Sequence, residues 1–136
     1  MTTRIVVRAV VYDPERQRIL LVKNRGGKHW YPVGGGWEPG ETLLEGVQRE
    51  VWEEAHLKID IIRFLYLREF HPNADEVWIE LYWLARPIGS GELSPEHVDL
   101  DPDSSIEEIS WMREKELADL LVFPQTTEKR ILAKRK

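Results

Sequence analysis

The residues best suited to chemistry are three glutamates grouped within five positions, Glu50, Glu53 and Glu54. On a helix their side chains share an arc of about 100°, and this arc runs into the apolar face of the same helix. Carboxylates at such spacings repel one another, by a few tenths of a kcal/mol per pair. Glu54 falls at the boundary of the core, where an unpaired carboxylate is costly. A divalent cation would relieve both penalties, and oxygen ligands in a chain without cysteine favour Mg²⁺ or Mn²⁺ over Zn²⁺.

The simpler interpretation of these glutamates is an acidic helix face exposed to solvent. No lysine lies within the predicted helix to relieve the repulsion, which favours the cation. Arg49, four residues before Glu53, is placed either to hold that glutamate in one rotamer or to form an ordinary surface ion pair. Both interpretations of Arg49 stay open on the residues alone.

A glycine run at residues 34–36, with a further Gly40, precedes the glutamates. A loop of this kind lets backbone groups approach a phosphate or a metal where a Cβ atom would collide. The alternative is an ordinary turn, because turns use glycine as well. We expect the run to end a short strand and to form such a loop.

The element that must position the glutamates is a helix, expected over residues 43–55. Thr42 and Glu45 have the Ser/Thr-x-x-Glu form of a capping box, which satisfies backbone N–H groups at the start of a helix. The apolar residues of this segment recur at helical spacing and predict a buried face.

Strands are expected on both sides of this helix. Composition and alternation favour strands at residues 3–12, 18–23, 30–33, 57–70 (bent or bulged), 76–84 and 106–112. Residues 24–28 and 86–105 read as loops, residues 71–75 as a turn, and residues 114–122 and 126–135 as helices. No internal repeat or linker interrupts this order, so we expect a single α/β domain over residues 1–136.

Charge and composition restrict the classes of function. The formal net charge is −5 and cysteine is absent, which argues against binding along a nucleic-acid backbone and excludes disulfides and thiolate metal sites. No apolar run approaches the roughly 20 residues of a membrane span, and no secretory leader begins the sequence. We expect a cytoplasmic protein without membrane contact, whose partner is a small phosphorylated molecule.

From Gly35 to Leu57 the chain resembles the Nudix box, G-x5-E-x7-R-E-U-x-E-E-x-G-U, in which U is a bulky aliphatic residue. The chain follows this pattern through Gly35, Glu41 and the run from Arg49 onward, and departs from it only at His56, where the family has glycine. That position ends the helix, and histidine is enriched among the non-glycine residues that adopt a positive φ. We expect His56 in the left-handed conformation, with the glutamates unaffected.

The resemblance implies a Nudix-like α/β/α sandwich with a mixed β-sheet. It implies a pyrophosphohydrolase that cleaves a phosphoanhydride bond in a nucleoside diphosphate linked to another moiety, by metal-assisted attack of water. Mg²⁺ is the implied cofactor, with Mn²⁺ as the substitute. The metal ligands carried over from the family are Glu50, Glu53, Glu54 and the carbonyl of Gly34.

Roles in the reaction are carried over in the same way. Glu41 and Arg49 match residues that brace the metal ligands, and Glu53 or Glu54 matches a group that orients or deprotonates the attacking water. A glutamate from a later loop does this in some members, for which Glu107 and Glu108 are the candidates. The alternative for this acidic pair is a solvated position beside a strand.

Residues that could contact the substrate are Lys23 and Arg25, near the glycine run, and the backbone of Gly35 and Gly36. Charges that only keep a loop soluble are the alternative for Lys23 and Arg25. The substrate is a nucleoside triphosphate, ordinary or oxidised, or an ADP-ribose-like compound.

Two other classes occur on the same fold. One is a catalytically silent Nudix-like nucleotide-binding or sensor domain, which usually lacks the box glutamates that this chain keeps. The other is isomerisation of an isoprenoid diphosphate, which usually recruits a cysteine. The oligomeric state stays open, with a homodimer among the alternatives.

Overall fold

The computed structural model describes residues 1–93 and 106–117, which form six strands and two helices. In chain order these elements are β1 (Thr2–Asp13), β2 (Arg18–Asn24), β3 (Trp30–Gly36), α1 (Leu43–Ala55), β4 (Ile59–Asn73), β5 (Glu76–Pro87), β6 (Ile106–Arg113) and α2 (Glu114–Leu117). Each strand predicted from the sequence is present, with shifted ends.

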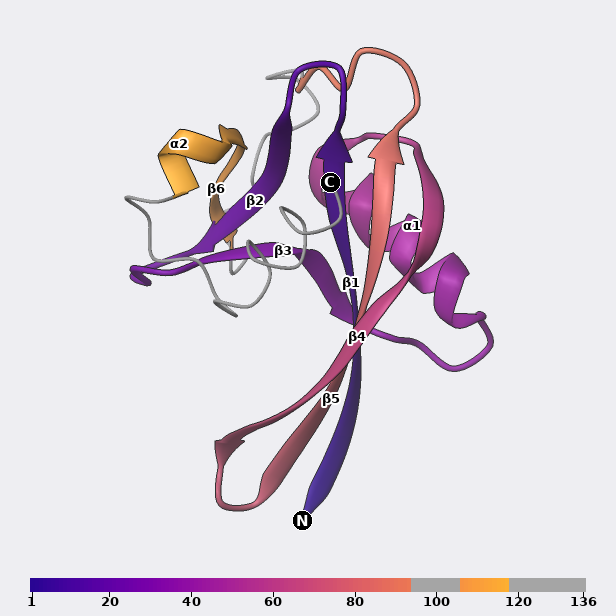
Figure 1. Ribbon diagram of the computed structural model, residues 1–136. Helices are drawn as coiled ribbons and strands as arrows, with labels where there is room; N and C mark the ends of the chain where they lie inside the picture. The colour runs from indigo at the N-terminus through magenta and orange to yellow at the C-terminus, as the bar shows by residue number, and fades with distance from the viewer. Residues whose placement is uncertain (94–105, 118–136) are drawn as a thin grey trace.

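The strands form one mixed sheet in the order β4-β5-β1-β3-β2-β6. β1 and β5 run parallel, and the other pairs are antiparallel. β3 changes partner half-way along, because its first residues pair with β2 and residues 33–36 pair with β1. Figure 1 shows β2 and β6 diverging from the twisted layer of β1, β4 and β5. The predicted mixed sheet is confirmed.

Both faces of the sheet are covered by helical residues. On one face Val47 and Val51 of α1 pack against Val7 and other buried strand residues. On the other face Leu117 of α2 packs in a second cluster that contains Tyr82. This arrangement of helix, sheet and helix agrees with the expected sandwich.

α1 begins and ends where the sequence predicts. The Glu45 N–H donates to Thr42 Oγ1 at 3.1 Å, and the Thr42 N–H donates to Glu45 Oε1 at 2.8 Å, which completes the capping box. His56 follows the helix with φ 52° and ψ 37°, the left-handed conformation expected for it, and its N–H donates to the Trp52 carbonyl at 2.9 Å. The two rings lie 4.8 Å apart between centroids.

The glycine run differs from the expectation, because residues 34–36 lie within β3 rather than in a loop. They pair with β1 in register, Gly34 with Arg8 and Gly36 with Val6. The pattern looked like a loop because glycine carries no β propensity of its own, whereas here the partner strand imposes the extended conformation.

The β4–β5 hairpin is also longer than predicted. β4 is bulged, as expected, but it continues to Asn73, so the predicted turn at residues 71–75 shrinks to two residues. Phe70 meets Trp78 edge-on across the hairpin, with centroids 5.8 Å apart. The Thr2 N–H donates to the Asp75 carbonyl at 2.8 Å. Figure 1 shows the N-terminus beside this turn, at the tip of the arm that β1, β4 and β5 form.

Some expectations fall outside the described residues. The predicted loop at 86–105 loses its first two residues to β5, and residues 94–105 are not described. The predicted helix at 114–122 agrees with α2 as far as Leu117, and the one at 126–135 lies beyond the described part. Across residues 1–93 and 106–117, no helix is long and apolar enough to cross a membrane.

Candidate active site

The centre of the site is the guanidinium of Arg49, which joins α1 to the segment before it. Its Nε and Nη2 donate to the two carboxylate oxygens of Glu41 at 2.9 and 2.8 Å, and Nη2 also donates to the Gly36 carbonyl at 3.1 Å. Nη1 donates to Glu50 at 2.9 Å and to Glu53 at 3.3 Å. A single arginine therefore ties two of the three clustered glutamates to the end of β3 and the loop that follows it.

The Glu41 carboxylate is held both by Arg49 of α1 and by the loop that precedes the helix. Its Oε1 accepts the Glu38 N–H at 3.0 Å in addition to Arg49. The Arg49 hydrogen bonds, helped by the Glu38 N–H, lower the pKa of the Glu41 carboxyl to about 2. A Cβ on Gly46 would stand 2.9 Å from Glu41 Oε1, so α1 needs glycine there to approach this carboxylate. Glu41 thus stays ionised as the counter-ion of Arg49.

Glu50 is buried, with 9% of its surface exposed, and faces β3. A Cβ on Gly35 would stand 2.7 Å from Glu50 Oε2, so the carboxylate occupies the space beside this glycine. Burial raises the pKa of the Glu50 carboxyl, against the opposing charge of Arg49. The close approach predicted for the glycine run is therefore made by a glutamate of α1.

Glu54 lies on the same helix face, one turn after Glu50. Its Oε2 is buried and has no hydrogen-bond partner among the described residues. Burial first, and the Glu50 charge second, raise the pKa of Glu54 to about 8, although Arg8 and a hydrogen bond from the Gly34 backbone oppose the shift. Such an orphaned carboxylate oxygen is uncommon in a folded core and indicates a missing partner.

The three glutamates do not form a ready-made cation cage. No three His, Cys, Asp or Glu side chains of residues 1–93 and 106–117 lie together as a metal site. The contacts explain this, because Glu50 and Glu53 turn toward Arg49 while Glu54 turns away into a pocket. Joint coordination of one ion would require new side-chain rotamers at Glu50 or Glu53.

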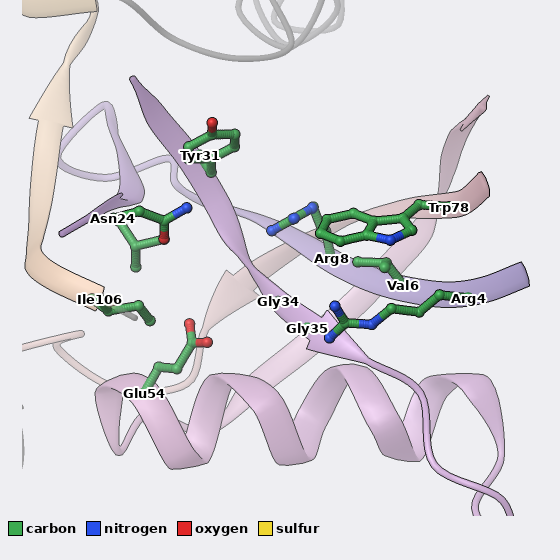
Figure 2. A pocket seen from close by; sticks show the side chains of 11 residues that line it. Arg4, Val6, Arg8, Asn24, Tyr31, Gly34, Gly35, Glu54, Trp78 and Ile106 are labelled. Atoms are coloured by element: carbon green, nitrogen blue, oxygen red, sulfur yellow. The ribbon is translucent and has the colours of Figure 1, made fainter. Parts of the chain in front are cut away.

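Beside Glu54 lies a pocket of about 150 Å³, walled by residues of β1, β2, β3, β5 and β6. Figure 2 shows Glu54 pointing toward it from α1, with Arg4, Arg8 and Trp78 on one side and Asn24 and Ile106 on the other. Tyr31, Gly34 and Gly35 complete the part of the wall that β3 supplies. The pocket combines two cationic side chains, one carboxyl and two aromatic rings.

The predicted substrate residues Lys23 and Arg25 are not in the wall of this pocket. Lys23 Nζ lies 3.3 Å from Glu107 Oε2, and Arg25 is exposed in the loop after β2. Glu108 is exposed on β6, whose contribution to the pocket is Ile106. The roles assigned to Lys23, Arg25 and Glu108 stay predictions.

Sequence reasoning overlooked Arg4 and Arg8, which do reach the pocket. The signal was present in β1, where Arg4 precedes and Arg8 interrupts an apolar run, at a spacing that places both on one face of a strand. Only the strand order, which places β5 and β3 on either side of β1, shows that this face of β1 lines a pocket.

Comparison with known proteins agrees with this geometry. The NUDIX domain profile matches residues 2–134. The chain belongs to the Nudix family. The 8-oxo-dGDP phosphatase NUDT18 of Homo sapiens is 38% identical over 84 residues, which are 58% of this Nudix chain and 24% of that protein. NUDT18 of Mus musculus is 36% identical over 104 residues, which are 74% of this chain and 30% of that protein.

These relatives are much longer, so the matched part of the Nudix chain spans about a quarter to a third of their length. Among solved structures, a NUDIX hydrolase from Nitrosomonas europaea has a TM-score of 0.75 at 17% identity, covering 98% of this chain and 89% of that chain. An ADP-ribose pyrophosphatase from Streptococcus suis has a TM-score of 0.70 at 24% identity, covering 99% and 94%. At these identities the likeness establishes the Nudix fold.

Proposed function

We propose that the chain is a Nudix pyrophosphohydrolase, which cleaves a phosphoanhydride bond in a nucleoside diphosphate linked to another moiety. The observation that carries the proposal is the carboxyl of Glu54, whose orphaned oxygen is buried between Glu50 and a pocket containing Arg8. A buried acid beside a cationic pocket suits a reaction at a phosphate group.

A divalent cation fits the residues present. Members of this family generally use divalent metal ions, and Glu54 Oε2 is a buried acceptor without a partner among the described residues. We propose that Glu50, Glu53, Glu54 and the carbonyl of Gly34 would hold Mg²⁺, or Mn²⁺ in its place, since both prefer oxygen ligands. When bound, the cation supplies charge neutralisation at the phosphates and makes water more acidic.

The protein's own residues supply position and electrostatics. Arg49, held by Glu41, keeps the carboxylates of Glu50 and Glu53 near the end of β3, from where they would turn toward the cation. We propose Glu53 or Glu54 as the group that orients the attacking water and accepts its proton, with Glu108 as the alternative. The products are a nucleoside monophosphate and the phosphorylated second moiety.

The substrate class follows from the size and the walls of the pocket. A volume of about 150 Å³ is smaller than the 300–1,000 Å³ of typical ligand pockets, so it holds one part of a nucleotide. The NUDT18 relatives are named for 8-oxo-dGDP, and other similar proteins for ADP-ribose or UDP-X. We propose a substrate among nucleoside di- and triphosphates, oxidised forms included, and ADP-ribose-like compounds.

The test is a nucleotide panel that contains 8-oxo-dGDP, 8-oxo-dGTP, ADP-ribose and a UDP-sugar. Each compound is incubated with the chain in Mg²⁺, in Mn²⁺ and in EDTA, and the products are separated by ion-exchange chromatography. We expect a nucleoside monophosphate from at least one compound with either metal and none in EDTA. Binding without turnover of every compound would instead support the sensor-domain alternative.

The predictions of location, oligomeric state and nucleic-acid binding come from the sequence alone. A cytoplasmic location, a homodimer and the lack of nucleic-acid binding are inferences from the sequence, and we propose them only as such. A pocket that holds one part of a nucleotide, beside a cluster of acidic side chains, is compatible with a small-molecule partner.

A further inference from the structure

Two arginines of β1 cross the neighbouring strand β3 above its glycines. A Cβ on Gly34 would stand 2.7 Å from Cγ of Arg8, and a Cβ on Gly36 would stand 3.0 Å from Nη2 of Arg4. Alternate residues of a strand share one face, so both crossings lie on the same face of β3, opposite the face where Gly35 meets Glu50. Glycine at residues 34 and 36 therefore leaves room for two arginine side chains to enter the pocket.

Arg8 is held on two sides of its guanidinium. Its Nε donates to Glu80 Oε2 at 2.9 Å, and its Nη1 donates to the Pro32 carbonyl at 3.1 Å. Within the described part of the chain no hydrogen bond occupies Nη2, which leaves that nitrogen available at the pocket. The other oxygen of Glu80 accepts from Arg68 at 2.7 Å, so two arginines share one buried carboxylate.

Arg4 adds a second positive charge at the same pocket. Its guanidinium lies 4.8 Å from the centroid of the Trp78 ring, and among residues 1–93 and 106–117 it has no ion pair. Arg8 and Arg68 share the single carboxylate of Glu80, and Arg4 adds a further positive charge at a pocket whose wall contains one carboxyl, that of Glu54. This positive region stands out on a chain of net charge −5, and its natural ligand is an anion.

We propose that Arg4 and Arg8 bind the phosphate oxygens of the substrate diphosphate, in the pocket beside Glu54. Arginine suits this role because its planar fork can donate two parallel hydrogen bonds to a phosphate. The inference rests on the proposed function only for the nature of the ligand, because binding of the anion requires neither cation nor hydrolysis. It gives Arg4 and Arg8 the role that the sequence suggested for Lys23 and Arg25.

The test is calorimetric titration of the full chain in EDTA, with ADP as the charged probe and adenosine as the uncharged one. Arg4→Met is compared with Arg63→Met, which makes the same change of net charge at an exposed residue of β4 outside the pocket wall. We expect Arg4→Met to weaken ADP binding at least about tenfold, which is roughly 1.4 kcal/mol, and to leave adenosine unchanged. Arg63→Met should change neither probe by more than about twofold.

A second pair of variants distinguishes phosphate binding by Arg8 from a structural role of its ion pair with Glu80. Arg8→Lys and Arg68→Lys both keep a positive charge beside Glu80, but only Arg8 reaches the pocket. We expect Arg8→Lys alone to weaken ADP binding severalfold, with both variants melting within a few degrees of the unaltered chain. Equal losses in the two variants, equal losses in the Arg4 and Arg63 variants, or no binding of ADP to the unaltered chain would overturn the proposal.

These results are independent of catalysis. If the chain hydrolyses a panel compound but Arg4→Met and Arg8→Lys bind ADP as the unaltered chain does, the phosphate-binding role of the two arginines is excluded and the proposed function stands. Arginine-dependent ADP binding without hydrolysis of any compound would keep the anion site and remove the pyrophosphohydrolase.

Discussion

At the scale of single residues, the site depends on where each of three similar carboxyls lies. Glu53 is half-exposed and paired with Arg49, Glu50 is buried and paired with it, and the Glu54 carboxyl is buried beyond its reach. Three chemically identical side chains therefore differ in burial and in hydrogen bonding. Because the Oε2 atom of Glu54 is buried without a partner among the described residues, we expect Glu54 to be the most sensitive of the three positions.

Glu54→Gln is expected to lower turnover of the substrate by at least roughly 10²-fold, the scale of one strong electrostatic contact at a reacting centre. The fold should survive, because glutamine removes a buried acid that repels Glu50. Initial rates and thermal melts of both proteins check this. Unchanged turnover would exclude Glu54 from the site, and a collapse of the melting temperature would make its role structural.

His56 tests the left-handed end of α1. Its ring contact with Trp52 offsets part of the strain at φ 52°, so a substitution to glycine alone would mix two effects. His56→Gly and His56→Ala both remove the ring, but only alanine keeps a Cβ in the left-handed region. We expect the glycine variant to be more stable than the alanine variant by about 1 kcal/mol in urea denaturation. Equal stabilities would mean that the backbone is not strained there.

At the scale of elements, β3 connects the two halves of the sheet and lies against α1. Its glycines differ in what a side chain would meet, since a Cβ on Gly34 would stand 2.2 Å from the Val7 carbonyl oxygen, whereas one on Gly36 would meet only the flexible end of Arg4. The spacing between β1 and β3 therefore depends on Gly34.

Gly34→Ala should destabilise the chain by about 3 kcal/mol, because two paired backbones would have to separate. Gly36→Ala should cost less than about 1 kcal/mol, because only the Arg4 side chain must shift. Chemical denaturation of the two variants gives both losses in the free energy of unfolding, and each variant carries the same Gly→Ala change. Similar losses would show that entropy of the unfolded chain, rather than the approach of β1, governs both positions.

The last residue of β1, Asp13, is an acid whose ionisation should affect stability. Burial would raise the pKa of Asp13, but hydrogen bonds from the Arg16 backbone and from the Arg18 and Arg16 side chains outweigh it and lower the pKa. A depressed carboxyl pKa stabilises the fold above the unfolded-state value and loses this contribution as pH falls through the folded value. Asp13 therefore favours the folded state at neutral pH and ceases to do so in acid.

Asp13→Asn should lower the free energy of unfolding by about 1–3 kcal/mol at pH 7, the range for a buried group that loses its partners. The difference from the unaltered chain should shrink as pH falls below about 4. Asp60→Asn is the control, since Asp60 forms an exposed pair with Arg86 and should change stability little. A difference that does not depend on pH would contradict the ionised Asp13.

At the scale of the whole molecule, the proposed cation should be linked to folding. A ligand that binds only the folded chain raises the free energy of unfolding, by about 2.7 kcal/mol at a hundredfold excess over its Kd. We expect MgCl₂ to raise the melting temperature progressively, and NaCl of equal ionic strength to raise it much less. The same shift with both salts, or a full shift in Glu54→Gln, would argue against the cation at this site.

The sequence by itself determined the features that depend on residues close together in the chain. The capping box and the helical spacing of residues 43–55 are local, so both ends of α1 were predicted correctly. The Nudix family was evident for the same reason, because its box lies in one continuous stretch. The mixed sheet followed from the resemblance and is confirmed.

Only the tertiary structure decided which side chains from distant strands meet. The glycine run reads as a loop until β1 pairs with it and Arg4 and Arg8 cross it. Lys23 is close to the glycine run in sequence, yet β6 places Glu107 beside it, while Arg4 and Arg8, much farther away in the sequence, reach the pocket. Strand order and register set these contacts. Both depend on the energy of pairing between segments far apart in the sequence, which local propensity does not describe.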